Sequence, residues 1–199
     1  DSKKKTLFEQ YSGNPLALKI VATTIQDVFN GNISEFLNQK IAVFGDISAL
    51  LDQQFERLSD LEREVMYWLA INREPITLSQ LREDIVSPRA PHRLVEALES
   101  LVRRSFIDKA TQTQVEKSAP LFTIEPVLME YMTNKLIKQV CEEIATQEIV
   151  FLRYYALSKA QSKEYARVAQ IDFILKPVID ELLTVFKTQK DLKRIWLKF

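Results

Sequence analysis

The sequence contains very little glycine, cysteine and histidine. Its 199 residues include 3 glycines, 1 cysteine and 1 histidine. So little glycine argues against a glycine-rich phosphate loop and against an all-β fold with many tight turns. The single cysteine, Cys141, excludes an intramolecular disulfide, and the single histidine, His92, excludes zinc sites that need two histidines. We therefore expect a mostly helical protein of a reducing, cytoplasmic compartment, without a metal site.

The chain also lacks an excess of charge and long apolar runs. Its 27 Lys and Arg residues balance its 27 Asp and Glu residues, so the net charge is zero. That balance disfavours a protein that coats nucleic acid through its overall charge. No stretch reaches the roughly 20 consecutive apolar residues that a transmembrane helix needs, and we expect no membrane partner. The hydrophobic share of 46% is nevertheless large enough to build a folded core.

The middle of the chain carries three helix patterns followed by two strand patterns. Ser59 and Glu62 have the spacing of a capping box, which predicts the start of a helix. Thr77 and Gln80 repeat that spacing at the second helix. The predicted elements are helices over 59–72, 78–86 and 88–104 and strands near 105–110 and 121–124. Three helices followed by a β-hairpin indicate a winged helix, and a three-helix bundle with an added hairpin is the alternative.

Helical patterns flank this central part. We expect short helices in the first 45 residues and a further helix over 47–57. After the hairpin, the apolar spacing predicts one helix over 126–144 and another over 146–162. Helical structure is expected again over 171–199, with Pro177 as a start or a kink.

The expected fold class is therefore mainly α, with a helical subdomain, a winged helix and a helical C-terminal tail. These three parts are expected to span residues 1–57, 58–145 and 146–199. Because the chain begins at Asp1 rather than at a methionine, we expect it to be a segment of a longer protein.

No catalytic signature is visible in the sequence. It contains neither a G-x-x-x-x-G-K-[ST] loop nor a G-x-S-x-G elbow. The acidic pair Glu142 and Glu143 consists of adjacent residues, which do not share a helix face and are expected to be solvated. Cys141 has no neighbouring cation that would lower its pKa, and we expect it to be buried or half-buried. We therefore name no catalytic residue and do not expect this segment to be an enzyme.

Near the N-terminus lies the short motif Gly13-Asn14-Pro15-Leu16-Ala17-Leu18. It resembles the Gly-x-Pro-Leu-Ala-Leu motif of NB-ARC proteins, which belong to the STAND class of signalling ATPases. In that family the motif opens a helical subdomain, its proline packs near the adenine of the bound nucleotide, and a winged helix follows. The similarity continues over 52–59, ahead of the winged helix expected here. The resemblance implies that the adenine side of a nucleotide site includes Gly13, Asn14, Pro15 and Leu16.

A second motif, at 122–131, resembles the family's Met-His-Asp region, where the second wing strand runs into a helix. Ile124, Glu125 and Pro126 fall at the Met, His and Asp positions. The family's histidine reaches the β-phosphate of the nucleotide, whereas the carboxylate of Glu125 would repel a phosphate unless it were protonated or bridged by a metal. The alternative is that Glu125 only caps the helix that begins at Pro126, because an acidic side chain is favourable at a helix N-terminus.

The resemblance implies a non-catalytic regulatory segment. It would couple the ADP or ATP state of a P-loop domain, which would lie before Asp1 and hold the nucleotide with magnesium, to C-terminal repeats. Residues 147–199 are similar to the helical region of cyanobacterial-type NB-ARC proteins with WD repeats. The implied partners are these two domains of the same chain and, on activation, further copies of the protein. We expect the segment alone to hold no cofactor.

Two other functions are open at this point. A winged helix can bind DNA through its third helix, but Glu96 and Glu99 would then meet the phosphates, which disfavours a nucleic-acid partner. The chain could instead be a protein-interaction scaffold whose tail presents the pair Tyr154-Tyr155, or Trp196 with Phe199. For these aromatic residues the alternative is packing into the core or against a following domain.

Overall fold

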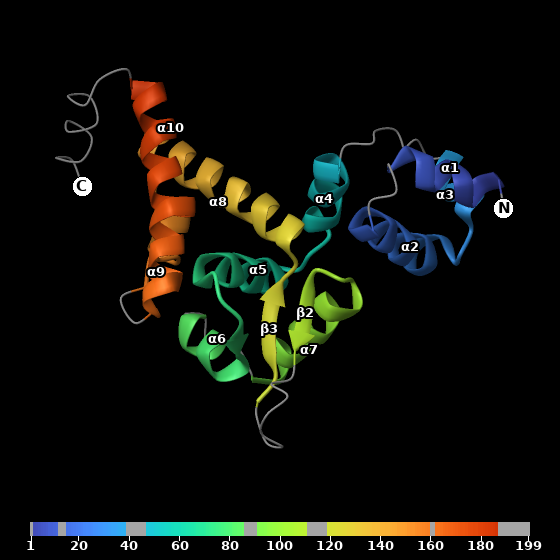
Figure 1. Cartoon of the computed structure of the whole chain (residues 1–199), viewed down its shortest axis with the longest axis horizontal. Helices are drawn as coiled ribbons and strands as arrows, with labels where there is room; N and C mark the ends of the chain where they lie inside the picture. Colours follow the sequence, from blue (N-terminus) through green and yellow to red (C-terminus); the bar gives the residue numbers. More distant parts are fainter. Residues whose placement is uncertain are drawn as a thin grey trace.

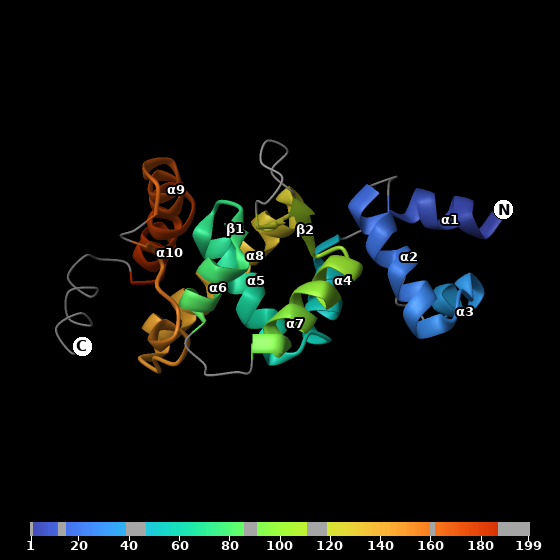
Figure 2. The same cartoon turned by 90° about the horizontal axis from the view of Figure 1, so that it is seen from below.

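A computed structural model describes residues 2–11, 15–38, 47–85, 91–110, 119–159 and 162–186. As predicted, the fold is mainly α, with one small antiparallel sheet (Figure 1). Figures 1 and 2 show the sheet and its helices at the centre, with α1–α3 on one side and α9 and α10 on the other. Across these described ranges, no helix combines the length and the apolar character needed to cross a membrane.

The elements follow the chain in a simple order. Before the winged helix come α1 (Ser2–Gln10), α2 (Pro15–Phe29), α3 (Ile33–Asn38) and α4 (Ile47–Glu56). The winged helix consists of α5 (Asp60–Asn72), β1 (Ile76–Thr77), α6 (Leu78–Asp84), α7 (Pro91–Arg103), β2 (Ile107–Ala110) and β3 (Leu121–Ile124). After it come α8 (Pro126–Thr146), the 3-10 turn η1 (Phe151–Arg153), α9 (Glu164–Gln170), the π-helical turn η2 (Ile171–Leu175) and α10 (Lys176–Phe186).

Both predicted capping boxes are present at the starts of α5 and α6. The hydroxyl of Ser59 accepts the backbone N–H of Glu62 at 3.3 Å, and the Glu62 carboxylate accepts the N–H of Ser59 at 2.7 Å. Thr77 and Gln80 make the same reciprocal pair. Each box satisfies two backbone donors that the first turn of a helix leaves free. The predicted starts of the first two helices of the winged helix are thus confirmed, at Ser59 and at Thr77.

The sheet contains one strand that the sequence did not predict. β3 lies between β1 and β2, and both neighbours pair with it antiparallel. In the hairpin, Ile107 lies opposite Ile124, and both side chains are buried. β1 has only two residues, so it carries no alternating pattern that could be recognised. Its residue Ile76 is 1% exposed opposite Phe122, which explains why so short a strand forms.

The core is centred on α5 and α8. Side chains of α5 that are fully buried include Val65, Met66 and Ile71. The predicted apolar stripe of α8 supplies four more buried residues, Leu128, Met132, Leu136 and Val140. α8 therefore belongs to the same packing unit as the winged helix.

The helix predicted over 146–162 is wrong. α8 ends at Thr146, and its C-cap residue Gln147 has a left-handed φ of 62°. Within the described stretch 147–159, the turn η1 is the one helical element. The reason is Glu143, which is 4% exposed and accepts the backbone N–H groups of Phe151 and Leu152. These side-chain contacts replace the hydrogen bonds of a helix. The expectation that Glu143 is solvated is therefore also wrong.

Gln170 fastens the following helix to the core. Its side chain is fully buried, its amide N–H donates to the carbonyl of Ile71 at 2.9 Å, and its carbonyl accepts the N–H of Lys159 at 3.1 Å. α9, η2 and α10 then run without interruption, with Pro177 as the second residue of α10. The structure describes this predicted helical tail as far as residue 186.

Candidate functional site

The predicted adenine-side residues lie at the start of α2. Gly13 and Asn14 fall outside the described residues, as does the side chain of Leu16. α2 begins at Pro15, whose missing N–H costs nothing in the first turn of a helix. Pro15 is exposed, so its ring is available to a neighbouring group.

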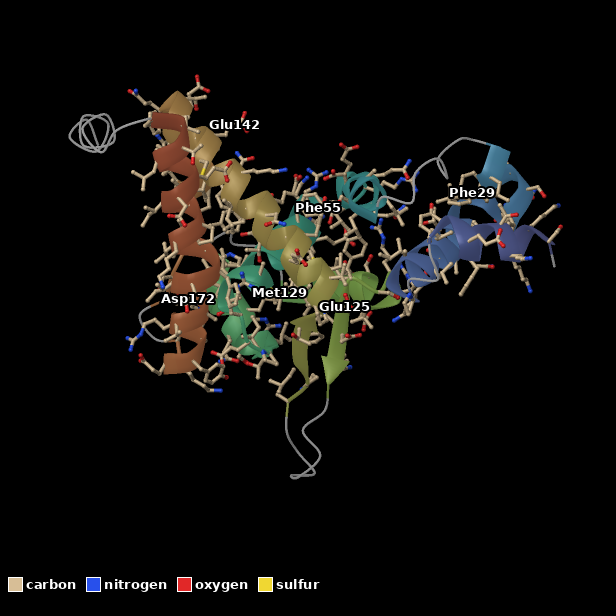
Figure 3. All side chains as sticks on the ribbon, turned by 45° about the horizontal axis from the view of Figure 1, so that its top comes forward. Phe29, Phe55, Glu125, Met129, Glu142 and Asp172 are labelled. Atoms are coloured by element: carbon tan, nitrogen blue, oxygen red, sulfur yellow. The ribbon has the colours of Figure 1, made fainter. Side chains whose placement is uncertain are left out.

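Glu125 lies where β3 passes into α8 (Figure 3). It is the N-cap residue of α8, and its carboxylate accepts the backbone N–H of Val127 at 2.9 Å. Its own carbonyl accepts the N–H of Met129 at 2.8 Å, and Pro126 follows as the first helical residue. The capping role is therefore present, and it leaves a charge-bearing acceptor, rather than a donor, at this position.

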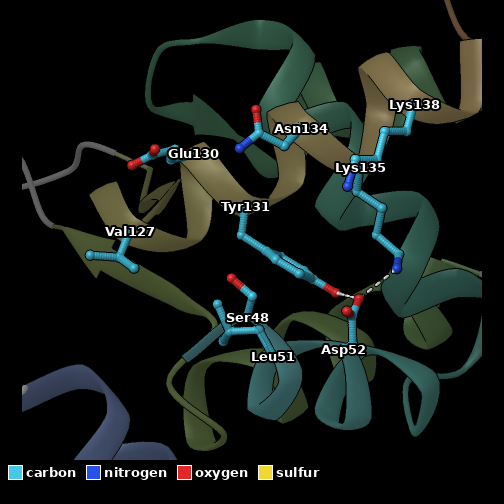
Figure 4. A pocket seen from close by; sticks show the side chains of 9 residues that line it. All are labelled: Ser48, Leu51, Asp52, Val127, Glu130, Tyr131, Asn134, Lys135 and Lys138. Atoms are coloured by element: carbon cyan, nitrogen blue, oxygen red, sulfur yellow. Dashed lines mark hydrogen bonds and ion pairs between the residues drawn. The ribbon is translucent and has the colours of Figure 1, made fainter. Parts of the chain in front are cut away.

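A cavity of about 450 Å³ opens between α4 and α8, starting at the first turn after Glu125 (Figure 4). Seven of its nine lining residues have polar or charged side chains, and both signs of charge are present. The lining residues are Ser48, Leu51, Asp52, Val127, Glu130, Tyr131, Asn134, Lys135 and Lys138. The cavity thus joins two of the three segments singled out in the sequence, 52–59 and 122–131.

The centre of this cavity is a hydrogen-bonded group that we call the α4–α8 joint: Asp52, Tyr131 and Lys135. The Tyr131 hydroxyl donates to Asp52 Oδ1 at 2.6 Å, and Lys135 Nζ donates to the same oxygen at 2.9 Å. Lys135 Nζ also lies 4.9 Å from the centre of the Phe55 ring, within cation–π range. Figure 4 shows the two α8 side chains converging on the α4 carboxylate.

The joint has a defined protonation state. Burial alone would raise the pKa of Asp52, but the hydrogen bonds from Tyr131 and Lys135 outweigh it and lower that pKa below its ordinary value. Burial, together with the hydrogen bond to Asp52, raises the pKa of the Tyr131 hydroxyl above its ordinary value. At neutral pH the carboxylate is charged and the tyrosine is protonated, so the group holds two helices together and is not poised for proton transfer.

The motifs at 52–59 and 122–131 include Asp52 and Tyr131, but the sequence predicted neither Lys135 nor the contact among the three residues. The apolar spacing places Tyr131 in the helix predicted over 126–144, and Asp52 lies in the segment 52–59. The two residues are 79 positions apart, and no local pattern links them. The available signal was the i, i+4 spacing of Tyr131 and Lys135, which places a hydroxyl and an ammonium group on one helix face.

The described residues offer little for covalent or metal chemistry. Cys141 is 5% exposed, as expected, and burial together with Glu181 raises the pKa of its thiol to about 11. Within the described ranges, no group of three or more His, Cys, Asp and Glu side chains could hold a metal ion. The polar groups of the cavity can bind and position, but they include no thiol or imidazole.

The surfaces considered for the alternative functions have mixed character. On α7 the exposed residues include Arg93, Glu96 and Glu99, so both signs of charge stand on the face of the third helix. Tyr155 stacks on Phe151 with ring centres 4.1 Å apart and so packs into the core, whereas Tyr154 is 57% exposed. Trp196 and Phe199 lie outside the described residues.

The chain is similar to one larger protein. It is 45% identical to an uncharacterized WD repeat-containing protein from Nostoc sp. (strain PCC 7120), over 92% of this chain and 17% of that protein. No family model matches the chain, and no solved structure matches it. The chain thus spans about a sixth of the length of a relative that carries WD repeats.

Proposed function

We propose that this chain is a non-catalytic regulatory segment of a STAND-class signalling ATPase that also carries a P-loop domain and WD repeats. The similarity to a WD repeat-containing protein supports the repeats, and the order of the two motifs around a winged helix supports the NB-ARC relationship. In this proposal residues 1–57 form the helical subdomain, 58–145 the winged helix and 146–199 the connection to the repeats. The protein acts in the cytoplasm, through domains of its own chain and through further copies of itself.

The α4–α8 joint is the observation that carries the mechanism. Asp52 stands on the last helix before the winged helix, whereas Tyr131 and Lys135 stand on the helix that leaves it. α8 has 21 residues and is therefore about 30 Å long, at 1.5 Å per residue. A displacement of α4 is transmitted through the joint to α8 and, along this rigid helix, to α9 and α10, which lead toward the repeats. The joint thus couples the N-terminal helices to the tail.

The nucleotide itself is recognised mainly by the P-loop domain. Exposed Pro15 at the start of α2 fits a contact with the adenine, together with Gly13, Asn14 and Leu16. Glu125 does not fit a contact with a phosphate, because its carboxylate is an acceptor that already caps α8. Phosphate and magnesium therefore bind elsewhere, and exchange of ADP for ATP shifts the population between a closed and an open arrangement of these subdomains.

Nucleotide retention tests this proposal. The longer protein that includes the residues before Asp1 is purified, and the adenine nucleotide bound to it is quantified after denaturation. We expect a G-x-x-x-x-G-K-[ST] loop before Asp1, ADP retained by the longer protein, and no micromolar ADP binding to the 199-residue chain by calorimetry. Absence of both the loop and retained nucleotide contradicts the proposal, and micromolar binding to the chain alone contradicts its non-binding role.

A further inference from the structure

A second hollow, of about 240 Å³, lies where α2 meets α4 and α7. In Figures 1 and 2, α4 and α7 belong to the central part of the molecule, and α2 lies next to them. We call this hollow the arginine hollow, because Arg57, Arg103 and Arg104 line it. It shares no lining residue with the α4–α8 cavity, and it includes neither Pro15 nor Glu125.

A buried amide in the arginine hollow lacks an acceptor. Gln54 is 5% exposed, and its side-chain Nε2 has no hydrogen-bond partner among the described residues. A buried donor without an acceptor costs about 1–3 kcal/mol, and most such groups in folded proteins are satisfied. Gln54 lines the hollow, and an acceptor that reaches its Nε2 from there removes this cost.

The positive charges of the guanidinium groups are only partly neutralised by acidic side chains. Among the described residues, neither Arg57 nor Arg103 has an acidic side chain within 4.0 Å, and both residues are exposed. Arg104 Nη1 lies 3.9 Å from the Glu62 carboxylate. Burial, and then the charges of Arg57 and Arg103, lower the pKa of Arg104, while Glu62 and Asp27 act in the opposite direction.

The other polar groups of the hollow define what it can bind. The Thr23 and Thr24 hydroxyls already donate to backbone carbonyls, at 3.0 and 2.9 Å, and the Ser100 hydroxyl donates to Glu62 at 2.6 Å. The donors without a described acceptor are therefore the guanidinium groups of Arg57 and Arg103 and the Gln54 amide, whereas the Arg104 guanidinium already faces Glu62. Asp27 is the one acidic residue among the described residues that line the hollow, so positive charge is in excess.

We infer that the arginine hollow binds a small phosphate-class oxyanion, such as inorganic phosphate or pyrophosphate. Guanidinium forks match the oxygen geometry of phosphate, and charge-assisted hydrogen bonds of this kind are strong. A volume of 240 Å³ corresponds to about eight water molecules and is below the 300–1,000 Å³ of pockets for larger ligands. The size therefore favours the small anion over a whole nucleotide. Bound there, the anion holds α2 against α4 and α7, and this role does not depend on the nucleotide function proposed above.

Titration with defined anions tests the inference. Inorganic phosphate, pyrophosphate and ADP are titrated separately into the purified 199-residue chain by calorimetry, at constant ionic strength in chloride. We expect saturable binding of phosphate or pyrophosphate, with ADP weaker than pyrophosphate because the adenosine does not fit. Arg103→Gln and Arg57→Gln are each expected to raise the Kd at least tenfold, since each removes a charge-assisted contact.

A matched control lies on the same helix as Arg103. Arg93→Gln removes the same charge from an exposed α7 position outside the hollow, and it is expected to leave the Kd within twofold of the wild-type value. Circular dichroism establishes that each variant is folded. No saturable binding of either anion, or an equal loss in Arg93→Gln and Arg103→Gln, overturns the inference. Binding of ADP alone also overturns it, because the hollow would then not be a small-anion site.

Discussion

Removal of one hydroxyl group from the α4–α8 joint has a predictable energetic effect. Tyr131→Phe keeps the ring, which packs edge-on against Phe55 at a centroid distance of 6.2 Å, and removes only the donor to Asp52. A hydrogen bond to a charged group contributes about 1.5–3 kcal/mol when it is buried. The Asp52 side chain is 54% exposed, so water replaces part of the lost bond, and we expect a loss of about 1 kcal/mol.

Urea unfolding followed by circular dichroism measures this loss. For a chain of this size, about 1 kcal/mol corresponds to a fall of about 2–4 °C in the melting temperature. A double-mutant cycle with Asp52→Asn should show a coupling energy of about 0.5 kcal/mol or more, because the two residues are in direct contact. Strict additivity of the two substitutions refutes the assignment of the hydrogen bond to stability.

The pH dependence gives a second check on the same bond. The pKa of Asp52 is lowered in the folded state, so its stabilising contribution is present above its unfolded pKa, about 3.9, and is lost as the pH falls through the folded value. The difference in stability between wild type and Tyr131→Phe should therefore be constant near neutral pH and shrink at acidic pH. A difference that grows on acidification contradicts the proposed protonation state.

Three further outcomes follow from individual contacts. In urea titrations, Glu143→Ala should lower the free energy of unfolding by about 3 kcal/mol, because two backbone N–H groups lose their acceptor. The control Glu142→Ala, at an exposed neighbouring position, should change the same free energy by less than about 0.5 kcal/mol. In thermal melts, Glu125→Ala should lower the stability of the fold by about 1 kcal/mol through loss of the N-cap, and Glu125→Asp should retain most of that stability. Equal losses of stability in the two variants contradict the capping role. With a thiol pKa of about 11, roughly one Cys141 in a thousand is a thiolate at pH 8, so iodoacetamide labelling followed by mass spectrometry should be slow until denaturant is added; fast native labelling refutes this.

The parts of the fold that were predictable are those fixed by neighbours in the sequence. The reciprocal pairs Ser59–Glu62 and Thr77–Gln80 place the starts of α5 and α6, since all the atoms involved lie within one helical turn. The stripe of α8 was also correct, because its buried residues recur at helical spacing. Local chemistry was enough to predict a winged helix.

The parts that were missed depend on residues far apart in the sequence. Glu143 turns the chain after α8 into an irregular segment by accepting N–H groups 8 and 9 residues later, and Gln170 holds that segment to Ile71, 99 residues away. The contact of Tyr131 with Asp52 is of the same kind. In each case a polar side chain on a helix makes a hydrogen bond to a group outside that helix. The spacing of apolar residues along the helix carries no information about that distant group.

The rate of ADP release from the longer protein tests the central claim most directly. With a fluorescent ADP analogue bound, the dissociation rate is compared among wild type, Tyr131→Phe, and Tyr154→Phe, which removes a hydroxyl from an exposed site outside the joint. If the joint couples the N-terminal helices to α8 and the tail, Tyr131→Phe changes the release rate severalfold and Tyr154→Phe leaves it unchanged. The same rate in all three proteins contradicts the coupling through Asp52, Tyr131 and Lys135.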